Sequence, residues 1–114
     1  MNVNDMTAQQ AADWCGEQDG WKWSEDRKGW VLGDRCLPYW PYPLTLDGAA
    51  AALPEGWRVD YMRDRKQITT PRWFVRALRL GGEFQSGICV EADDELTARY
   101  RLAVACRMAA KEQA

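Results

Sequence analysis

The chain of 114 residues contains no histidine, and this absence removes several kinds of site at once. Histidine is the usual general base near neutral pH and the commonest metal ligand. Without it, Ser–His and Cys–His nucleophile schemes are excluded. The sequence also has no P-loop, no G-x-G-x-x-G fingerprint and no H-E-x-x-H motif. These absences predict that the protein is not an enzyme and holds neither a cofactor nor a metal.

Long hydrophobic runs are missing as well. No stretch approaches the roughly 20 apolar residues of a membrane span, and the polar start MNVNDMTAQQ does not have the form of a secretory signal. The four cysteines are far apart and form no C-x-x-C pair. Three of them fall within apolar patterns, which favours reduced, buried thiols, although two disulfides stay open as an alternative. We therefore expect a cytoplasmic protein that does not interact with membranes.

Charge of one sign does not dominate, because 17 acidic residues face 15 basic ones and the net charge is −2. No overall field therefore points to nucleic acid or to an anionic membrane. Residues 58–79 form a local basic strip whose members are Arg58, Arg63, Arg65, Lys66, Arg72, Arg76 and Arg79. Solvated strand faces explain such a strip most simply. A weak contact with a phosphate backbone, beside Trp73, is the alternative.

The pattern of apolar residues indicates a single domain over residues 1–114. In its N-terminal part, 1–36, Thr7 and Gln10 fit a capping box for a short helix that Gly16 would end. Residues 20–24 and 30–32 read as a β-hairpin, with Gly33, Asp34 and Arg35 closing it. This part is expected to be α-β-β.

Residues 37–44 form a connector that cannot be helical, because it carries three prolines. An extended, polyproline-like conformation is expected. Its three aromatic residues, Tyr39, Trp40 and Tyr42, either fold back over the core or present a surface to a partner.

The core, residues 45–110, reads α-β-β-β-α. Thr45 can cap a helix that reaches Leu53, and three strand-like runs follow between Gly56 and Ala92. The run 73–80 is apolar on both parities, which predicts a central strand covered on both faces. A last helix to about residue 110 has a broad apolar distribution and should be covered on more than one side. The predicted fold is α+β: an antiparallel meander with helices packed on it as an αβα-type sandwich, in the order α-β-β-α-β-β-β-α.

Four acidic residues precede the last helix: Glu91, Asp93, Asp94 and Glu95. Capping of that helix explains them better than a divalent cation site. The order of elements over 45–110 is that of double-stranded RNA-binding domains. Those domains place lysines at the start of the last helix, where this chain has acids, so that mode of binding is disfavoured.

Several residues together resemble the phage ABA sandwich family. They are the runs Pro43–Ala52, Gly56–Trp57, Trp73–Val75 and Leu102–Ala109, and the likeness covers about residues 43–110. The resemblance implies a small protein of a tailed phage or prophage and a layered sheet, and it implies no activity. Members often carry a zinc-ribbon-like cysteine pair, but here Cys15 and Cys36 stand alone, so no metal site follows.

The expected function is that of a phage-encoded, non-enzymatic accessory protein that binds a host or phage protein, for example to block host defence or host machinery. A nucleic-acid-binding module that uses the basic 58–79 hairpin is the alternative, and a homo-oligomer stays open. The candidate partner-binding residues are Arg63, Arg65, Lys66, Arg72, Tyr39, Trp40 and Tyr42.

Overall fold

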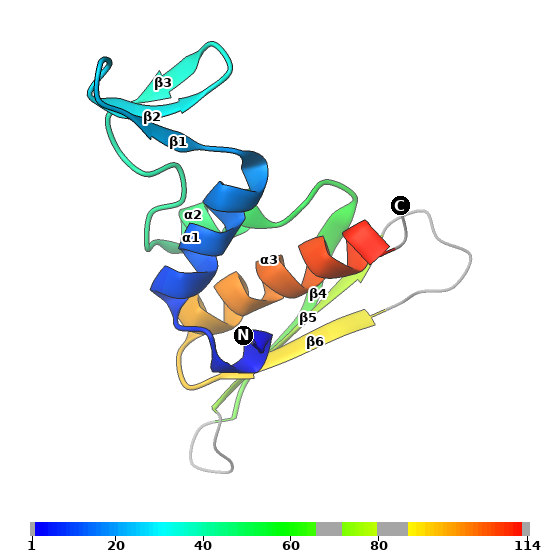
Figure 1. Cartoon of the computed structure of the whole chain (residues 1–114). Coiled ribbons are helices and arrows are strands. Elements are labelled where there is room, and N and C mark those ends of the chain that lie inside the picture. Colours follow the sequence, from blue (N-terminus) through cyan, green and yellow to red (C-terminus); the bar gives the residue numbers. More distant parts are fainter. Residues whose placement is uncertain (1, 66–71, 80–86, 113–114) are drawn as a thin grey trace.

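The computed structural model describes residues 2–65, 72–79 and 87–112. Its fold is α+β, as the sequence predicts, and it consists of two three-stranded antiparallel sheets and three α-helices. The chain runs from a 3-10 turn (η1, Val3–Asp5) into α1 (Ala8–Asp19), then through β1 (Lys22–Ser24), β2 (Gly29–Leu32) and β3 (Arg35–Leu37). It continues through α2 (Leu46–Ala52), β4 (Trp57–Asp64), β5 (Trp73–Arg79), β6 (Gly87–Ala92) and α3 (Glu95–Glu112) (Figure 1).

Helix α3 is the central element of the molecule. One side packs on the β4–β5–β6 sheet through Ala98, Leu102 and Cys106. Another side packs on α1 and α2 through Tyr100 and Val104. These five side chains of α3 are almost fully buried. The expectation that this helix is covered on more than one side is therefore confirmed. Its many small residues allow sheet and helices to approach its axis closely.

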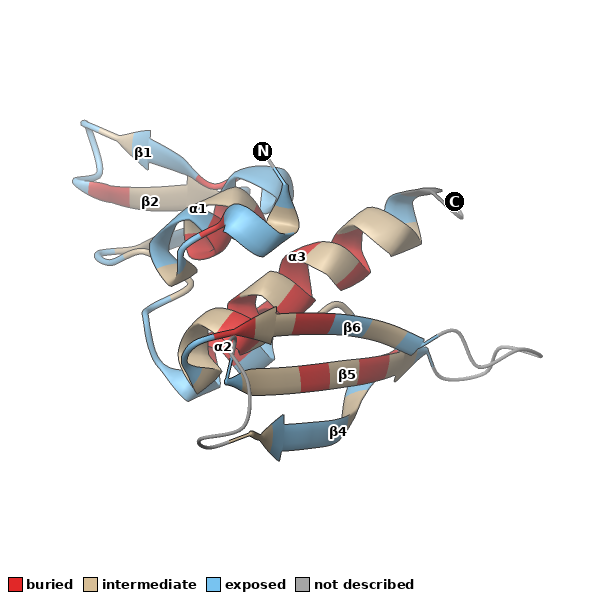
Figure 2. Ribbon diagram, turned by 90° about the horizontal axis from the view of Figure 1, so that it is seen from below, coloured by how far each residue is buried: buried red, intermediate tan, exposed pale blue. Residues whose placement is uncertain are grey.

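The layering differs from the expected one. All three helices lie on the same side of the β4–β5–β6 sheet, with α3 against the sheet and α1 beyond α3 (Figures 1 and 2). Along β5, Val75 and Ala77 are buried while Phe74, Arg76 and Leu78 stay partly exposed, so helices cover one face of this strand. The prediction that both faces are covered was wrong, although the second set of alternating residues in β5 also contains apolar side chains. One of them, Phe74, packs edge-on against Tyr61 of the neighbouring strand rather than under a helix.

The N-terminal part contains one strand more than predicted. The hairpin β1–β2 is present, and β3 extends it into a sheet because Leu32 and Arg35 pair across a two-residue turn at Gly33 and Asp34. Gly33 has a φ of 57°, a left-handed conformation that glycine adopts at no steric cost, and Gly-Asp is a known hairpin signal. The strand was missed because it spans three residues before the prolines begin.

The helix starts agree with their capping signals. The Thr7 hydroxyl accepts a hydrogen bond from the backbone N–H of Gln10, and the Gln10 side chain accepts one from Thr7. Thr45 caps α2 through Gly48. The predicted end of α1 at Gly16 is wrong: the helix continues to Asp19, and Gly20, with a φ of 97°, ends it. Among the described residues, no helix has the length and apolar character needed to cross a membrane.

Candidate functional site

Two arginines of the predicted basic strip, Arg65 and Arg72, lie in ion pairs. The guanidinium of Arg65 lies 2.7 Å from a carboxylate oxygen of Glu91 and 5.8 Å from the centre of the Phe74 ring. Arg72 forms a two-pronged pair with Asp64, at 2.5 and 2.7 Å. The positive charge that a phosphate backbone would need is thus already matched by carboxylates at these two positions.

The same pairing continues on the solvent-facing side of the sheet. Arg76 donates to both carboxylate oxygens of Asp60, and these hydrogen bonds hold the pKa of the Asp60 carboxyl below its usual value. Arg63 is exposed near the end of β4, and Lys66 lies outside the described residues. Of the three predicted basic residues that the structure describes, Arg65 and Arg72 are paired with carboxylates and Arg63 is exposed.

The aromatic connector divides into two parts. Tyr39 is 62% exposed, so it points to solvent. Trp40 and Tyr42 fold back onto the helices. The indole N–H of Trp40 donates to the backbone carbonyl of Ala12 at 3.3 Å, and the Tyr42 hydroxyl donates to the carboxylate of Asp19. The connector thus anchors the β1–β2–β3 sheet, which we call the small sheet, to α1 and presents one aromatic side chain outward.

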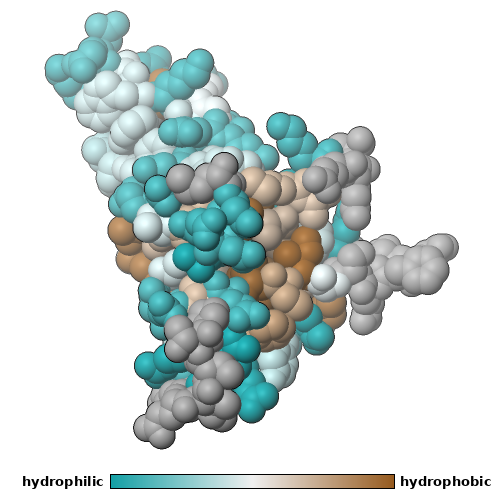
Figure 3. Space-filling view, turned by 60° about the horizontal axis from the view of Figure 1, so that its bottom comes forward, coloured by the Kyte–Doolittle hydropathy of each residue, from teal (hydrophilic) through white to brown (hydrophobic). Residues whose placement is uncertain are grey.

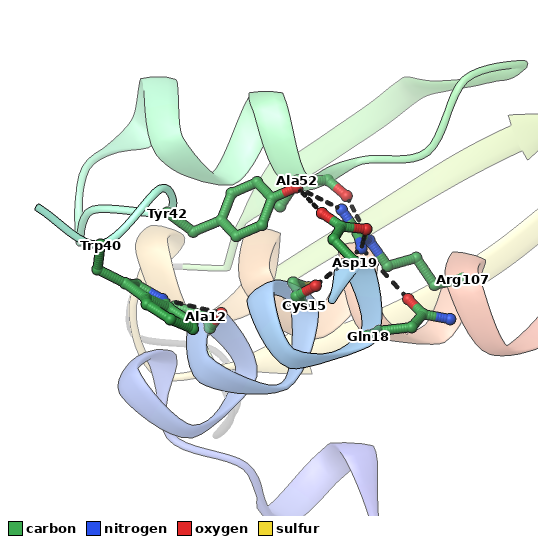
Figure 4. Close-up of polar contacts among 8 residues, drawn as sticks. All are labelled: Ala12, Cys15, Gln18, Asp19, Trp40, Tyr42, Ala52 and Arg107. Atoms are coloured by element: carbon green, nitrogen blue, oxygen red, sulfur yellow. Dashed lines mark hydrogen bonds and ion pairs between the residues drawn. The ribbon is translucent and has the colours of Figure 1, made fainter. Parts of the chain in front are cut away.

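Tyr42 belongs to a polar cluster around the buried Arg107 (Figure 4). The Arg107 guanidinium donates to the backbone carbonyls of Ala52 at 2.8 Å and Cys15 at 3.1 Å, and it pairs with Asp19 at 2.7 Å. Its remaining nitrogen donates to the Tyr42 hydroxyl at 3.0 Å. Burial, followed by the hydrogen bond to Asp19, raises the pKa of Tyr42. Because its donors are used on α1, α2 and the connector, this cluster joins elements rather than forming a reaction centre.

The position of Trp40 depends on Gly16 in α1. A Cβ atom at residue 16 would lie 2.1 Å from Cζ2 of Trp40, so only glycine leaves room for the indole. On its other side, Trp40 meets Trp30 of β2 edge-to-face, with ring centres 4.5 Å apart. Trp40 therefore lies between the first helix and the small sheet.

A solvent-open groove results between α1 and the small sheet. It has a volume of about 500 Å³ and is lined by Trp21, Trp30 and Trp40 on the aromatic side and by Gln9, Asp13 and Glu17 of α1 on the other. We call these six residues the tryptophan groove. The two charged side chains described along its wall, Asp13 and Glu17, are both acidic. An aromatic wall opposite carboxylates can bind an organic cation.

Only Trp40 of this groove was among the predicted site residues. The sequence does contain a signal for the rest: Gln9, Asp13 and Glu17 recur every four residues, which places them along one side of a helix. What the sequence could not show is that the connector carries Trp40 back to complete the wall.

The cysteines offer no evident chemistry in this fold. Burial raises the pKa of the Cys15 thiol to about 11 and that of Cys106 to about 12, so both stay protonated near neutral pH. Cys36 and Cys89 are exposed, and all four are free thiols. Within the described ranges, no group of three or more acidic or cysteine side chains is arranged to hold a metal ion. Asp94 caps α3 by accepting from the backbone N–H of Thr97 at 2.8 Å, as predicted.

Two other surfaces are weaker candidates. A smaller hollow of about 240 Å³ lies between α2 and β4, beside Leu53 and Trp57. Hydrophobic side chains also gather over α3 and the adjoining β4–β5–β6 sheet (Figure 3). The tryptophan groove combines shape, aromatic rings and charge, so it is the candidate functional site.

Comparison with known proteins gives no relative for this chain. No protein-family model matches it, and neither a curated protein nor a solved structure is detectably similar.

Proposed function

We propose that this chain is a non-enzymatic, phage- or prophage-encoded accessory protein that binds a host protein through the tryptophan groove. The sequence of residues 43–110, which resembles a family of small phage proteins, supports the origin. The lack of histidine supports a binding role rather than a catalytic one. Interference with host defence or host machinery is the role that such binding would serve.

One observation carries the proposal: three tryptophans line a single solvent-open groove of about 500 Å³. Tryptophan is among the residues that contribute most to binding energy in protein interfaces, because one side chain offers a large, rigid, amphipathic surface. Such a wall is held in place here by the Trp30–Trp40 contact and by the Trp40–Ala12 hydrogen bond. A pre-positioned wall lowers the entropic cost of association.

The test is capture of a partner from a bacterial host lysate with two charge-reversed variants. Glu17→Lys places a cation in the groove, and Glu55→Lys makes the same change at an exposed site outside it. The wild type and Glu55→Lys should retain one stoichiometric partner, while Glu17→Lys should lose it. Equal capture by all three proteins, or no stoichiometric partner for the wild type, would contradict the proposal.

The nucleic-acid alternative is disfavoured by the carboxylates that face the basic strip, since Arg65, Arg72 and Arg76 each pair with one. A phosphate would have to displace these partners. Binding to a DNA or RNA duplex, measured at two salt concentrations, decides between the functions. Binding through phosphate contacts weakens steeply with salt: the logarithm of the binding constant falls with the logarithm of the salt concentration, with a slope of roughly −0.9 per contact. Such a slope, lost when Arg63, Arg65 and Lys66 are replaced together, would favour the alternative.

A further inference from the structure

We propose that the tryptophan groove receives an arginine side chain of the partner protein. In this arrangement the guanidinium lies against the indole wall and donates hydrogen bonds to Asp13 and Glu17. The inference rests on the proposed function, because it names the chemistry of the partner at the same groove. It adds a specific ligand group, which the proposed function does not require.

The aromatic wall suits a planar cation. Guanidinium groups stack on indole faces, where they gain both an electrostatic and a dispersion contribution. The chain already uses this pairing beside the groove, since the guanidinium of Arg35 lies 5.2 Å from the centre of the Trp21 ring. It uses a related one at Arg107, which lies 5.3 Å from the Tyr42 ring. One ring of the wall, that of Trp21, therefore already lies beside the kind of group that we assign to the partner.

The helical wall supplies the opposite charge. Asp13 and Glu17 are four residues apart on α1, so their carboxylates lie on the same side of the helix. Gln9 donates to one oxygen of Asp13 at 2.8 Å, which positions that side chain at the groove, and a carboxylate has further lone pairs that can accept from another donor. Asp13 is partly exposed and Glu17 is exposed, so both can be reached from solvent.

This combination selects arginine over other groups. The guanidinium offers five donors in a rigid plane, and two carboxylates can use them while the plane stays against the rings. A lysine ammonium is a compact, strongly hydrated charge that cannot stack in this way. A phosphate would be repelled by the two carboxylates, which argues against a nucleic-acid occupant at this groove.

The experiment follows the indole N–H signals of the seven tryptophans by NMR while N-acetyl-arginine amide is added to the full chain. The signals of Trp21, Trp30 and Trp40 should move together on addition of the ligand. Those of Trp57 and Trp73, which pack in the core between α3 and the β4–β5–β6 sheet, should not move. The citrulline derivative, which has the same shape without charge, and the lysine derivative serve as ligand controls.

The matched variants keep the fold under control. Asp13→Asn with Glu17→Gln removes both charges and should weaken the arginine derivative about tenfold or more, since each charge-assisted hydrogen bond contributes strongly. Asp26→Asn with Glu55→Gln makes the same changes at exposed sites elsewhere and should leave affinity unchanged. Both double variants should unfold at the urea concentration of the wild type.

Three results would overturn the inference: no movement of the three groove signals, equal affinity for the citrulline derivative, or equal or tighter binding of the lysine derivative. Capture of the host partner separates the two proposals. A partner retained fully by Asp13→Asn/Glu17→Gln refutes the arginine site and leaves the proposed function standing. Movement of the groove signals without any captured partner supports the site and refutes the proposed function.

Discussion

Replacement of Arg107 by alanine should destabilise the protein more than any exposed change on the same helix. Arg107 is 8% exposed, and its guanidinium donates to carbonyl oxygens of α1 and α2 as well as to Asp19 and Tyr42. Among the described residues, no other side chain donates hydrogen bonds to α1, α2 and the connector together. Alanine would leave the acceptors of these elements without their donor.

The magnitude follows from the burial of the partners. Loss of one member of a buried ion pair costs about 3–5 kcal/mol when the other member stays desolvated. The Asp19 side chain is 31% exposed, so water can compensate part of that loss. The carbonyl of Ala52 belongs to a fully buried residue, and an unsatisfied buried acceptor costs about 1–3 kcal/mol. A loss of about 3 kcal/mol is therefore expected, a large share of the roughly 5–15 kcal/mol typical of a domain.

Urea unfolding followed by tryptophan fluorescence measures the loss. With an m value of about 1.5 kcal/mol/M, the midpoint should fall by about 2 M. Arg107→Lys keeps the positive charge but loses the planar set of guanidinium donors. Its urea midpoint should therefore lie between those of the wild type and Arg107→Ala. Arg99→Ala on the same helix removes an i,i+4 pair with Glu95 and should cost about 0.5 kcal/mol. A cost for Arg107→Ala below about 1 kcal/mol, or equal to that of Arg99→Ala, would refute the role of the cluster.

Three further predictions concern packing, thiols and pH. Gly16→Ala should cost about 1–3 kcal/mol in urea unfolding, because its Cβ would overlap Trp40, and the cost should shrink when Trp40→Ala is combined with it. Iodoacetamide at pH 8 should modify the exposed Cys36 and Cys89 and spare Cys15 and Cys106, as read by mass spectrometry. The folded pKa values of the buried thiols, Cys15 and Cys106, are about 11 and about 12 against an ordinary 9.0. The stability that their burial confers is therefore complete below pH 9 and is lost as pH rises from 9 towards these values. Asp60→Asn should lower the thermal midpoint at pH 7. Because Arg76 holds the pKa of Asp60 below its ordinary 3.8, this difference should fade as pH drops through and below that value, and a constant difference down to pH 2 would contradict the ion pair.

Local signals in the sequence identified most elements correctly, because they act over a few residues. The capping residues Thr7 and Thr45 fix two helix starts, and the alternation around Trp57 and Val90 marks strands of one sheet. The extent of α1 was less accessible. Gly16 has the form of a stop signal, yet its role is to admit the Trp40 ring, a contact between residues 24 positions apart in the sequence.

The layering was beyond local reasoning for a related reason. An apolar side chain on a strand can be covered by a helix or by a neighbouring side chain on the same sheet. Phe74 is covered by such neighbours, Tyr61 and Arg65. Likewise, a cluster of arginines in sequence shows nothing of its carboxylate partners. Glu91 is 26 residues from Arg65, and Asp60 is 16 residues from Arg76, so the charge of the strip is decided by strand register.

Strand register and the course of the connector also decide where the tryptophans lie. Trp23 and Trp30 are direct cross-strand partners, and a connector with three prolines reverses direction without helix so that Trp40 reaches the same cluster. The polar stripe of α1 then faces the aromatic side because its small apolar stripe, Ala11, Ala12 and Cys15, is buried against α2 and α3. Burial of one stripe thus determines which side chains meet the rings. The acidic character of the groove is therefore a consequence of how α1 packs, and a change that rotates this helix should alter the groove and the core together.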